Sequence, residues 1–140
     1  MSQATDYLEN KLADALSTLG TLDLSDGTVT DGTGGYIGLF TTAPDDTGAA
    51  TEVNGGSYAR IQIGSAGQSA LTANGDSCQN AGEFRFPDST GNWGTILAIG
   101  LFDAAVGGNA LIYGTLTSSV VIGTGEIFKI PANGFTITLS

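Results

Sequence analysis

Acidic side chains are the residues of this chain whose spacing could support catalysis. Asp45 and Asp46 follow Pro44, and Glu52 lies one short loop further on. Two carboxylates that flank a glycosidic bond could hydrolyse it, one as acid and the other as nucleophile or base. Asp45 and Asp46 are adjacent, however, and neighbouring residues of an extended strand point to opposite faces. We therefore expect a solvated loop rim here rather than an active site.

A second acidic group could gather around calcium, which prefers oxygen ligands: Asp23, Asp26 and Asp31. The segment lacks the D-x-[DN]-x-[DN]-G spacing of a calcium-binding loop, and Asp with Gly is equally typical of turns. A structural cation here is thus the lesser alternative. We expect the protein to use neither a metal nor a cofactor.

Nucleophilic catalysis lacks its usual partners. The 140 residues contain no histidine, the commonest general base and zinc ligand. Cys78 is the single cysteine, so no internal disulfide can form, and we expect a small packed or loop residue there. Gly32 and Gly34 lack the third glycine and the following lysine of phosphate-binding loops. We expect that the protein is not an enzyme and has no catalytic residues.

Three aromatic side chains, Tyr58, Trp93 and Tyr113, could form a platform on which sugar rings stack. Single aromatic residues inside strand-like runs are more often anchors of a hydrophobic core. Core positions are therefore the expectation for all three, and the sugar platform is the alternative.

The charge balance excludes several classes of partner. Four Lys plus Arg against 14 Asp plus Glu give a net charge of −10. So few cations cannot neutralise a phosphate backbone or attract anionic lipids, so we expect neither nucleic acid nor membrane as a partner. No apolar run reaches the ~20 residues of a membrane span, and the first residues lack the pattern of a signal peptide. Arg60, one of the four cations, is expected to pair with Glu52 or Asp103.

One amphipathic helix is predicted over residues 5–19. Its leucines recur at spacings of four, four and three, which lines one helical face: Leu8, Leu12, Leu16 and Leu19. Thr5 or Asp6 would cap the start of this helix, and Gly20 its end. We expect the leucine face to be a partner-contact surface, covered either by the sheet of its own chain or by a neighbouring subunit.

Beyond the helix, the pattern predicts a loop and then β-structure. Residues 20–35 are rich in Gly, Asp and Thr, as loops are, and apolar and polar residues alternate further on, as in half-buried antiparallel strands. The predicted strands are 36–42, 57–64, 68–73, 83–87, 95–102, 110–117, 120–122, 126–130 and 135–139. The chain is thus predicted to be one domain, residues 1–140, whose residues 36–140 form an antiparallel, jelly-roll-like β-sandwich.

Glycines within and between these runs carry local predictions. Asn133-Gly134 and Gly107-Gly108 supply residues that tolerate positive φ, as tight hairpins require. Gly38 and Gly100 stand inside predicted strands, where glycine indicates a bulge or a close approach of backbone.

Several blocks of the chain resemble, in order, a family of small tailed-bacteriophage virion proteins. They are TDYLENKL at 5–12, YIGLFTTAP at 36–44, TEVNGGSYAR at 51–60, FP at 86–87, WGTI at 93–96, GLFDA at 100–104 and GNAL at 108–111. The resemblance implies a structural role in the virion, because members are tail-fibre-like proteins and similar small β-domains serve as head decoration, or cement, proteins. No catalytic motif of the family maps onto this chain.

From this resemblance we expect a capsid decoration protein that binds the major capsid protein or other virion proteins. Such a chain would be made in the host cytoplasm and act on the virion surface as a homo-oligomer. The alternative is a tail-fibre or tail-tip domain that binds a host-surface receptor or glycan. A third class, the carbohydrate-binding module of a soluble enzyme, would require binding together with turnover.

Overall fold

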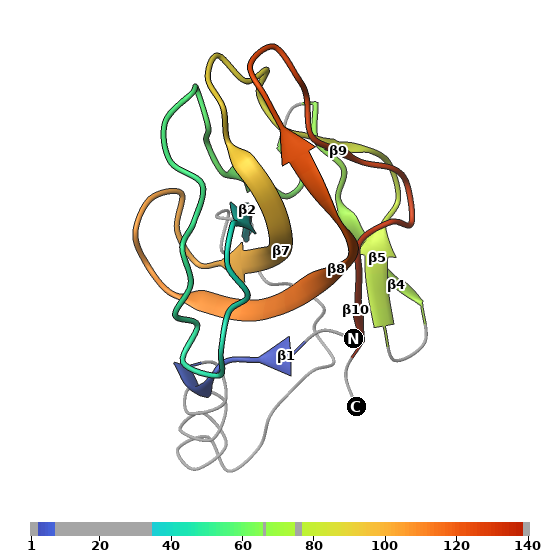
Figure 1. The fold of residues 1–140 in the computed structure, drawn as a ribbon. Coiled ribbons are helices and arrows are strands. Elements are labelled where there is room, and N and C mark those ends of the chain that lie inside the picture. Colours follow the sequence, from blue (N-terminus) through green and yellow to red (C-terminus); the bar gives the residue numbers. More distant parts are fainter. Residues whose placement is uncertain (1–2, 8–34, 66, 75–76, 139–140) are drawn as a thin grey trace, which may run out of the picture.

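The computed structural model describes residues 3–7, 35–65, 67–74 and 77–138 (Figure 1). Apart from the helical backbone of Asp6 and Tyr7, the secondary-structure elements within these ranges are strands, and every strand pair is antiparallel. The predicted mainly-β, antiparallel class is therefore confirmed. The strands are divided among three sheets, so the two-sheet sandwich of jelly-roll type is not confirmed.

The largest sheet has five strands in the order β1-β8-β7-β2-β3. Their bounds are Gln3–Ala4 for β1, Tyr36–Phe40 for β2, Ile61–Gln62 for β3, Gly94–Phe102 for β7 and Ala110–Ile122 for β8. The long β7–β8 hairpin curves through the middle of the molecule (Figure 1). It carries β2 on one side and β1 on the other, so it is the frame on which the sheet is built.

Strand β8 is continuous where the sequence predicts two strands with a break at 118–119. The register explains the difference. Ile96 pairs with Val120 but Ala98 pairs with Thr115, so two steps along β7 correspond to five along β8. The extra residues form an irregularity in the ladder, and bulges of this kind bend a strand. Ser118 and Ser119, which lie between the two predicted strands, are thus in the irregular part of one long strand.

The remaining strands form two small sheets. One has the order β10-β5-β4, with β4 at Leu71–Asn74, β5 at Ser77–Asn80 and β10 at Thr136–Thr138; the other pairs β6, Phe84–Arg85, with β9, Lys129–Ile130. Strands β1 and β5 were not predicted. Their residues, Gln-Ala and Ser-Cys-Gln-Asn, lack an apolar alternation, and they are strands because neighbouring strands offer backbone hydrogen bonds.

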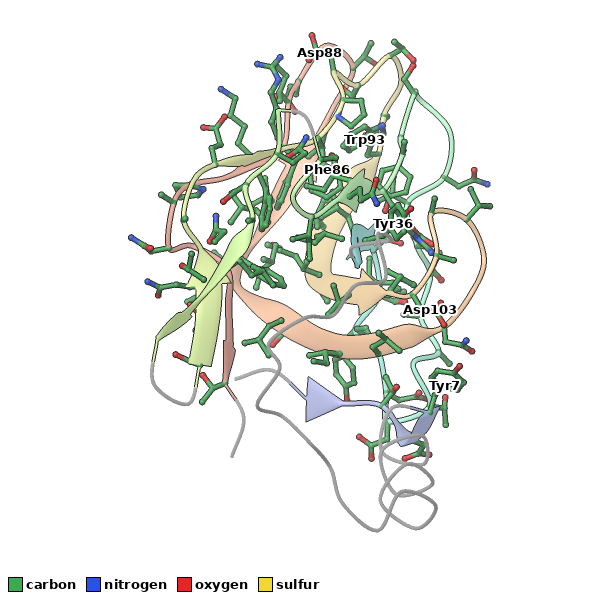
Figure 2. The ribbon with its side chains drawn as sticks, turned by 180° about the vertical axis from the view of Figure 1, so that it is seen from behind. Tyr7, Tyr36, Phe86, Asp88, Trp93 and Asp103 are labelled. Atoms are coloured by element: carbon green, nitrogen blue, oxygen red, sulfur yellow. The ribbon has the colours of Figure 1, made fainter. Side chains whose placement is uncertain are left out.

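The main core lies between the five-stranded sheet and the β6–β9 pair. Its buried residues are Ile37, Leu39, Val53, Ile61, Phe84, Phe86, Trp93, Ile96, Ile99, Ile122, Phe128 and Ile130. Phe84 and Phe86 are both 0% exposed and flank the exposed Arg85, which confirms the predicted alternation. Figure 2 shows Phe86 and Trp93 pointing into this interior, whereas Asp88 points outward from one end.

Two glycines face each other across β2 and β7, because Gly38 pairs with Gly100 in an unbroken stretch of register. A Cβ on Gly38 would come within 2.7 Å of Phe102 Cε2, and one on Gly100 would meet the ring of Phe40. Aromatic rings therefore lie directly on the backbone here. The sequence predicted a bulge or a close approach of backbone at these glycines; what approaches each of them closely is a set of side chains instead.

The N-terminal segment enters the sheet as a strand. Thr5 is fully buried next to β1; its amide donates to the Leu111 carbonyl (2.8 Å) and its hydroxyl to the Ala110 carbonyl (2.7 Å). Of the predicted helix at 5–19, only Thr5, Asp6 and Tyr7 are described. Asp6 and Tyr7 have helical backbone, but no helix is bounded within the described residues, so the predicted helix is not supported. Residues 8–34, which include the leucine face and the predicted loop, lie outside the described residues.

Candidate functional site

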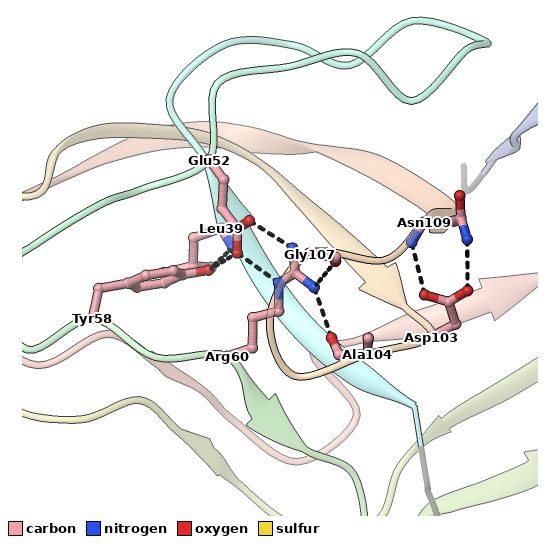
Figure 3. A network of polar contacts seen from close by, with 8 residues as sticks. All are labelled: Leu39, Glu52, Tyr58, Arg60, Asp103, Ala104, Gly107 and Asn109. Atoms are coloured by element: carbon pink, nitrogen blue, oxygen red, sulfur yellow. Dashed lines mark hydrogen bonds and ion pairs between the residues drawn. The ribbon is translucent and has the colours of Figure 1, made fainter.

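Arg60 is the centre of a polar network at one end of the five-stranded sheet (Figure 3). Its Nε donates to Glu52 Oε1 (2.8 Å) and its Nη2 to Glu52 Oε2 (2.7 Å). This bidentate geometry is the strongest that an arginine and a carboxylate adopt. The Arg60 side chain is only 6% exposed, and that of Glu52 26%. The predicted pairing of Arg60 with Glu52 is therefore confirmed. Together with Tyr58, whose hydroxyl also bonds Glu52, these two residues form a cluster that we call the arginine clasp.

The third nitrogen of Arg60 holds the β7–β8 loop, residues 103–109. Nη1 donates to the carbonyls of Ala104 (2.7 Å) and Gly107 (2.8 Å). The guanidinium also lies over the Phe102 ring, with Cζ 3.5 Å from the ring centroid, a cation–π contact. One side chain therefore joins the chain around residue 60 to a loop more than forty residues away.

Tyr58 completes the clasp from the other side of Glu52. Its hydroxyl donates to Glu52 Oε1 (2.8 Å) and accepts the amide of Leu39 in β2 (2.8 Å). Burial is the main cause that raises the pKa of the Tyr58 hydroxyl, and the Glu52 charge adds to it. The phenol is therefore a neutral donor across the physiological range. A Cβ on Gly38 would reach within 2.9 Å of Glu52 Oε1 and 3.1 Å of the Tyr58 hydroxyl, so glycine leaves room for the clasp.

Asp103 closes the base of the β7–β8 loop instead of pairing with Arg60. Its carboxylate accepts hydrogen bonds from the Asn109 amide (2.7 Å) and from Asn109 Nδ2 (2.9 Å). These bonds, that of the Asn109 side chain foremost, lower the pKa of Asp103 below its ordinary value. At the loop tip Gly107 and Gly108 have φ of 65° and 67°, as the turn prediction requires.

The β7–β8 loop carries the most exposed of the large apolar side chains that the structure describes. Val106 is 88% exposed and lies beside a shallow hollow of about 510 Å³ that is lined by residues 52–54, 58–60 and 105–107. The polar atoms beneath it are bonded to one another, as the clasp shows (Figure 3). Such a site is suited to contact with another surface, because its groups are already held in place before a partner arrives.

The carboxylates that could have formed a glycosidase pair accept hydrogen bonds from different partners. Asp45 accepts hydrogen bonds from the hydroxyl and amide of Thr47 and from the amide of Ala49. These bonds, with the Thr47 hydroxyl first, lower the pKa of Asp45. The exposed Asp46 accepts the Tyr113 hydroxyl (3.3 Å), whereas Glu52 belongs to the clasp. Asp45 and Asp46 therefore form a loop rim, as predicted.

The aromatic residues are packing anchors. Trp93 and Tyr113 are buried, 4% and 7% exposed, which confirms the core prediction for both; Tyr58 is half-buried. Tyr58 meets Trp93 edge-on, with ring centroids 5.4 Å apart, and Trp93 Nε1 donates to the Gly56 carbonyl (2.9 Å). Tyr113 lies elsewhere, beside Asp46. The structure does not assemble the alternative sugar platform from these three rings.

Other predicted site residues fall in different places. Leu8, Leu12, Leu16 and Leu19, together with Asp23, Asp26 and Asp31, lie outside the described residues. Cys78 stands in β5, in register with Ala73 of β4 and Ile137 of β10. Among the residues that the structure describes, no three Cys, Asp or Glu side chains gather as metal ligands would, and no helix has the length and apolarity needed to span a bilayer.

Sequence reasoning missed the exposure of Val106 and the position of the loop on which it lies. The glycines at 107 and 108 indicated a turn, but a single valine in a loop carries no signal of its own. The scarcity of cations did point to Arg60, although not to the loop carbonyls that it binds.

Comparison with known proteins relates the chain to a family of phage proteins. No curated protein matches the chain. A family model described as "Podophage GP4 fiber I protein gp80" matches residues 3–138. This range leaves out only two residues at each end, and it includes every strand described above. The chain therefore belongs to the family of podophage GP4 fiber I protein gp80, a family of small, tail-fibre-like proteins of tailed phages.

Proposed function

We propose that this protein is a fibre component of the tail of a podophage-like virion. As a member of a phage fiber family, the chain is a virion structural protein that associates with other virion components. The observation that carries the finer proposal is the family's description as a fiber protein over nearly the whole chain. Capsid decoration, the function expected from the sequence, is the other outcome of the experiment below.

The arrangement of side chains supports a role in contact rather than in catalysis. The clasp and the Asp103–Asn109 pair hold the β7–β8 loop, and Val106 stands on it as an exposed apolar side chain. With a net charge of −10, the protein fits a partner surface that is basic around an apolar recess. We propose this loop as a contact with another virion protein.

Two further expectations belong to this proposal. The chain is proposed to act as a single unit over residues 1–140, in several copies per fibre. The leucine face of Leu8, Leu12, Leu16 and Leu19 is proposed as a second contact, because an apolar stripe of this kind gains free energy when a partner covers it.

Localisation in the particle tests the function directly. A particle reconstruction by electron microscopy, with a small tag fused to this chain, should show the added density at the tail. Quantitative mass spectrometry of purified particles should give copy numbers in the range of the tail proteins, well below that of the major capsid protein. Density spread over the head, with copy numbers that approach the capsid protein, would instead establish decoration.

A further inference from the structure

The chain has three Asn-Gly pairs, and the structure describes both residues of two of them, Asn54-Gly55 and Asn133-Gly134. All four of these residues are exposed. An asparagine that precedes glycine can lose its side-chain amide without an enzyme, because glycine has no Cβ to hinder the approach of its own backbone nitrogen to the asparagine side chain. Solvent access is alike at the two pairs, so a difference in their reactivity must come from the backbone.

The loss of the side-chain amide, deamidation, proceeds in two steps. The glycine backbone nitrogen bonds to the asparagine Cγ, and the side-chain nitrogen leaves as ammonia, taking up the proton that the backbone nitrogen releases. Water then opens one of the two carbonyl groups of the resulting five-membered succinimide, which gives aspartate or isoaspartate. A hydrogen bond from the glycine N–H opposes the first step, because this bond must break before the nitrogen can turn toward Cγ.

At the second of the two pairs, the glycine amide is held in such a bond. The Gly134 amide donates to the Pro131 carbonyl (2.9 Å), and the Asn133 amide donates to the Asn80 carbonyl (2.8 Å). A Cβ on Gly134 would lie 2.9 Å from the Pro131 oxygen, so the backbone is closely packed at this turn. Attack on Asn133 therefore requires the turn to open first.

At the first pair, the glycine amide is available. The Gly55 amide has no hydrogen-bond acceptor among the residues that the structure describes, whereas the Gly55 carbonyl accepts the Tyr58 amide (3.0 Å). A Cβ on Gly55 would find nothing within 4 Å, so the space beside this glycine is open. The nitrogen that would attack the Asn54 side chain is thus free, although the turn that follows it is fixed.

We propose that Asn54 is a site of spontaneous deamidation and that Asn133 is protected from the same reaction by its turn. Asn54 lines the hollow beside Val106, the surface proposed above as a contact. Deamidation there replaces a neutral amide by a carboxylate, so the charge of this surface changes with the age of the protein. The reaction needs only water, and the proposal therefore stands whether or not the fibre role does.

The isoaspartate product changes the backbone as well as the charge. The main chain then runs through the former side chain of position 54 and is longer by one methylene group. The residues on either side are fixed, because the Val53 amide donates to the Leu39 carbonyl (3.0 Å) and the Gly56 carbonyl accepts Trp93 Nε1 (2.9 Å). The added length falls between these two anchors, next to the arginine clasp. We therefore expect the isoaspartate form to unfold at a lower temperature than the aspartate form.

Peptide mass spectrometry of the aged protein tests the proposal. The full chain is incubated at mildly alkaline pH and digested at intervals with trypsin, which cuts after Lys11, Arg60 and Lys129. The peptides 12–60 and 130–140 then contain one asparagine each, Asn54 and Asn133. The mass increase of an amide replaced by an acid should appear in peptide 12–60 at least about fivefold faster, the equivalent of about 1 kcal/mol.

The matched control is the same incubation in concentrated urea, where both glycine amides are free of the fold and the two rates should become similar. Equal rates in the folded protein, a faster reaction at Asn133, or the same ratio of rates with and without urea would each overturn the proposal. The third Asn-Gly pair falls in peptide 61–85 and does not affect either reading.

Thermal unfolding separates the two products. The variant Asn54→Asp carries the aspartate product from the start, and the isoaspartate form is purified from aged protein by chromatography and identified by electron-transfer fragmentation. The Tm of the isoaspartate form should lie below that of Asn54→Asp, which differs from it only in the course of the main chain. An equal Tm would contradict the expected strain between Val53 and Gly56.

Discussion

Arg60 and Glu52 form a bidentate ion pair, with nitrogen–oxygen distances of 2.8 and 2.7 Å, at the point where three parts of the chain meet. Glu52 is bridged to Phe40 at the end of β2, and Arg60 precedes β3 directly. The remaining nitrogen of Arg60 reaches the β7–β8 loop. The pair therefore connects the edge of the sheet to its central hairpin, and its removal should affect the whole unit.

Replacement of Arg60 by methionine should lower the free energy of unfolding by about 3 kcal/mol, because Glu52 and two loop carbonyls lose their donors in a largely buried place. Urea denaturation measures this loss. Arg85→Met is the matched control: its pair with Asp88 is exposed, 46% and 67%, and should contribute less than about 1 kcal/mol. Equal effects of the two substitutions would show that the clasp contributes no more than a surface pair.

Tyr58→Phe should lower the free energy of unfolding by about 2 kcal/mol, because the amide of the fully buried Leu39 would lose its acceptor, the Tyr58 hydroxyl. Tyr113→Phe provides the comparison. The Tyr113 hydroxyl bonds the exposed Asp46 at 3.3 Å, and water can replace it there. Thermal unfolding of both variants should therefore show the larger fall in Tm for Tyr58→Phe, and the reverse order would contradict this account.

Gly38→Ala should destabilise the protein by about 2 kcal/mol, because the new methyl group would overlap Phe102 and crowd the clasp. Gly82→Ala is the control, since its Cβ would find its nearest neighbour, Ser69 Oγ, at an ordinary 3.6 Å. Denaturant midpoints measured side by side distinguish steric overlap from the general effect of alanine on a glycine position. A harmless Gly38→Ala would mean that the rings over β2 move aside freely.

The Asp103–Asn109 contact predicts a particular pH dependence. Asn109 lowers the pKa of Asp103 in the folded protein. The contribution of this contact to the free energy of unfolding is therefore fully present above the ordinary pKa of 3.8, and it is lost as the pH falls through the lowered pKa. In Asn109→Ala, the pKa of Asp103 should rise toward 3.8 when followed by carboxyl NMR. The pKa of Asp45, whose bonds come from Thr47 and Ala49, should stay unchanged and serves as the internal reference.

Val106→Asp should reduce incorporation of the protein into particles by at least about tenfold, the equivalent of about 1.4 kcal/mol, if the β7–β8 loop meets a partner. Its Tm should not change, because Val106 is 88% exposed. Val121→Asp introduces the same charge at another exposed valine, 66% exposed on β8. Unchanged incorporation of Val106→Asp, measured by quantitative blotting of purified particles, would remove this loop from the proposed contact.

Short-range patterns in the amino-acid sequence were sufficient for part of this picture. The alternation of Phe84, Arg85 and Phe86 predicted a strand with one buried face, because side chains of a strand alternate. The positive φ of Asn133, 63°, was likewise predictable from an Asn-Gly pair. Arg60 could be assigned a carboxylate partner from the scarcity of cations, although Glu52 and Asp103 were equal candidates until the fold separated them.

The sequence by itself thus determined the β class, the acidic charge and the absence of histidine chemistry, because these follow from composition and from neighbours along the chain. Tertiary structure alone decided that Gln3–Ala4 is a strand, that β8 runs unbroken through two serines, and that Val106 stands on a loop held by Arg60. Each of these depends on hydrogen bonds between residues tens of positions apart. Local preferences do not encode such pairings, since the free energy comes from a partner strand or side chain that only the folded chain brings near.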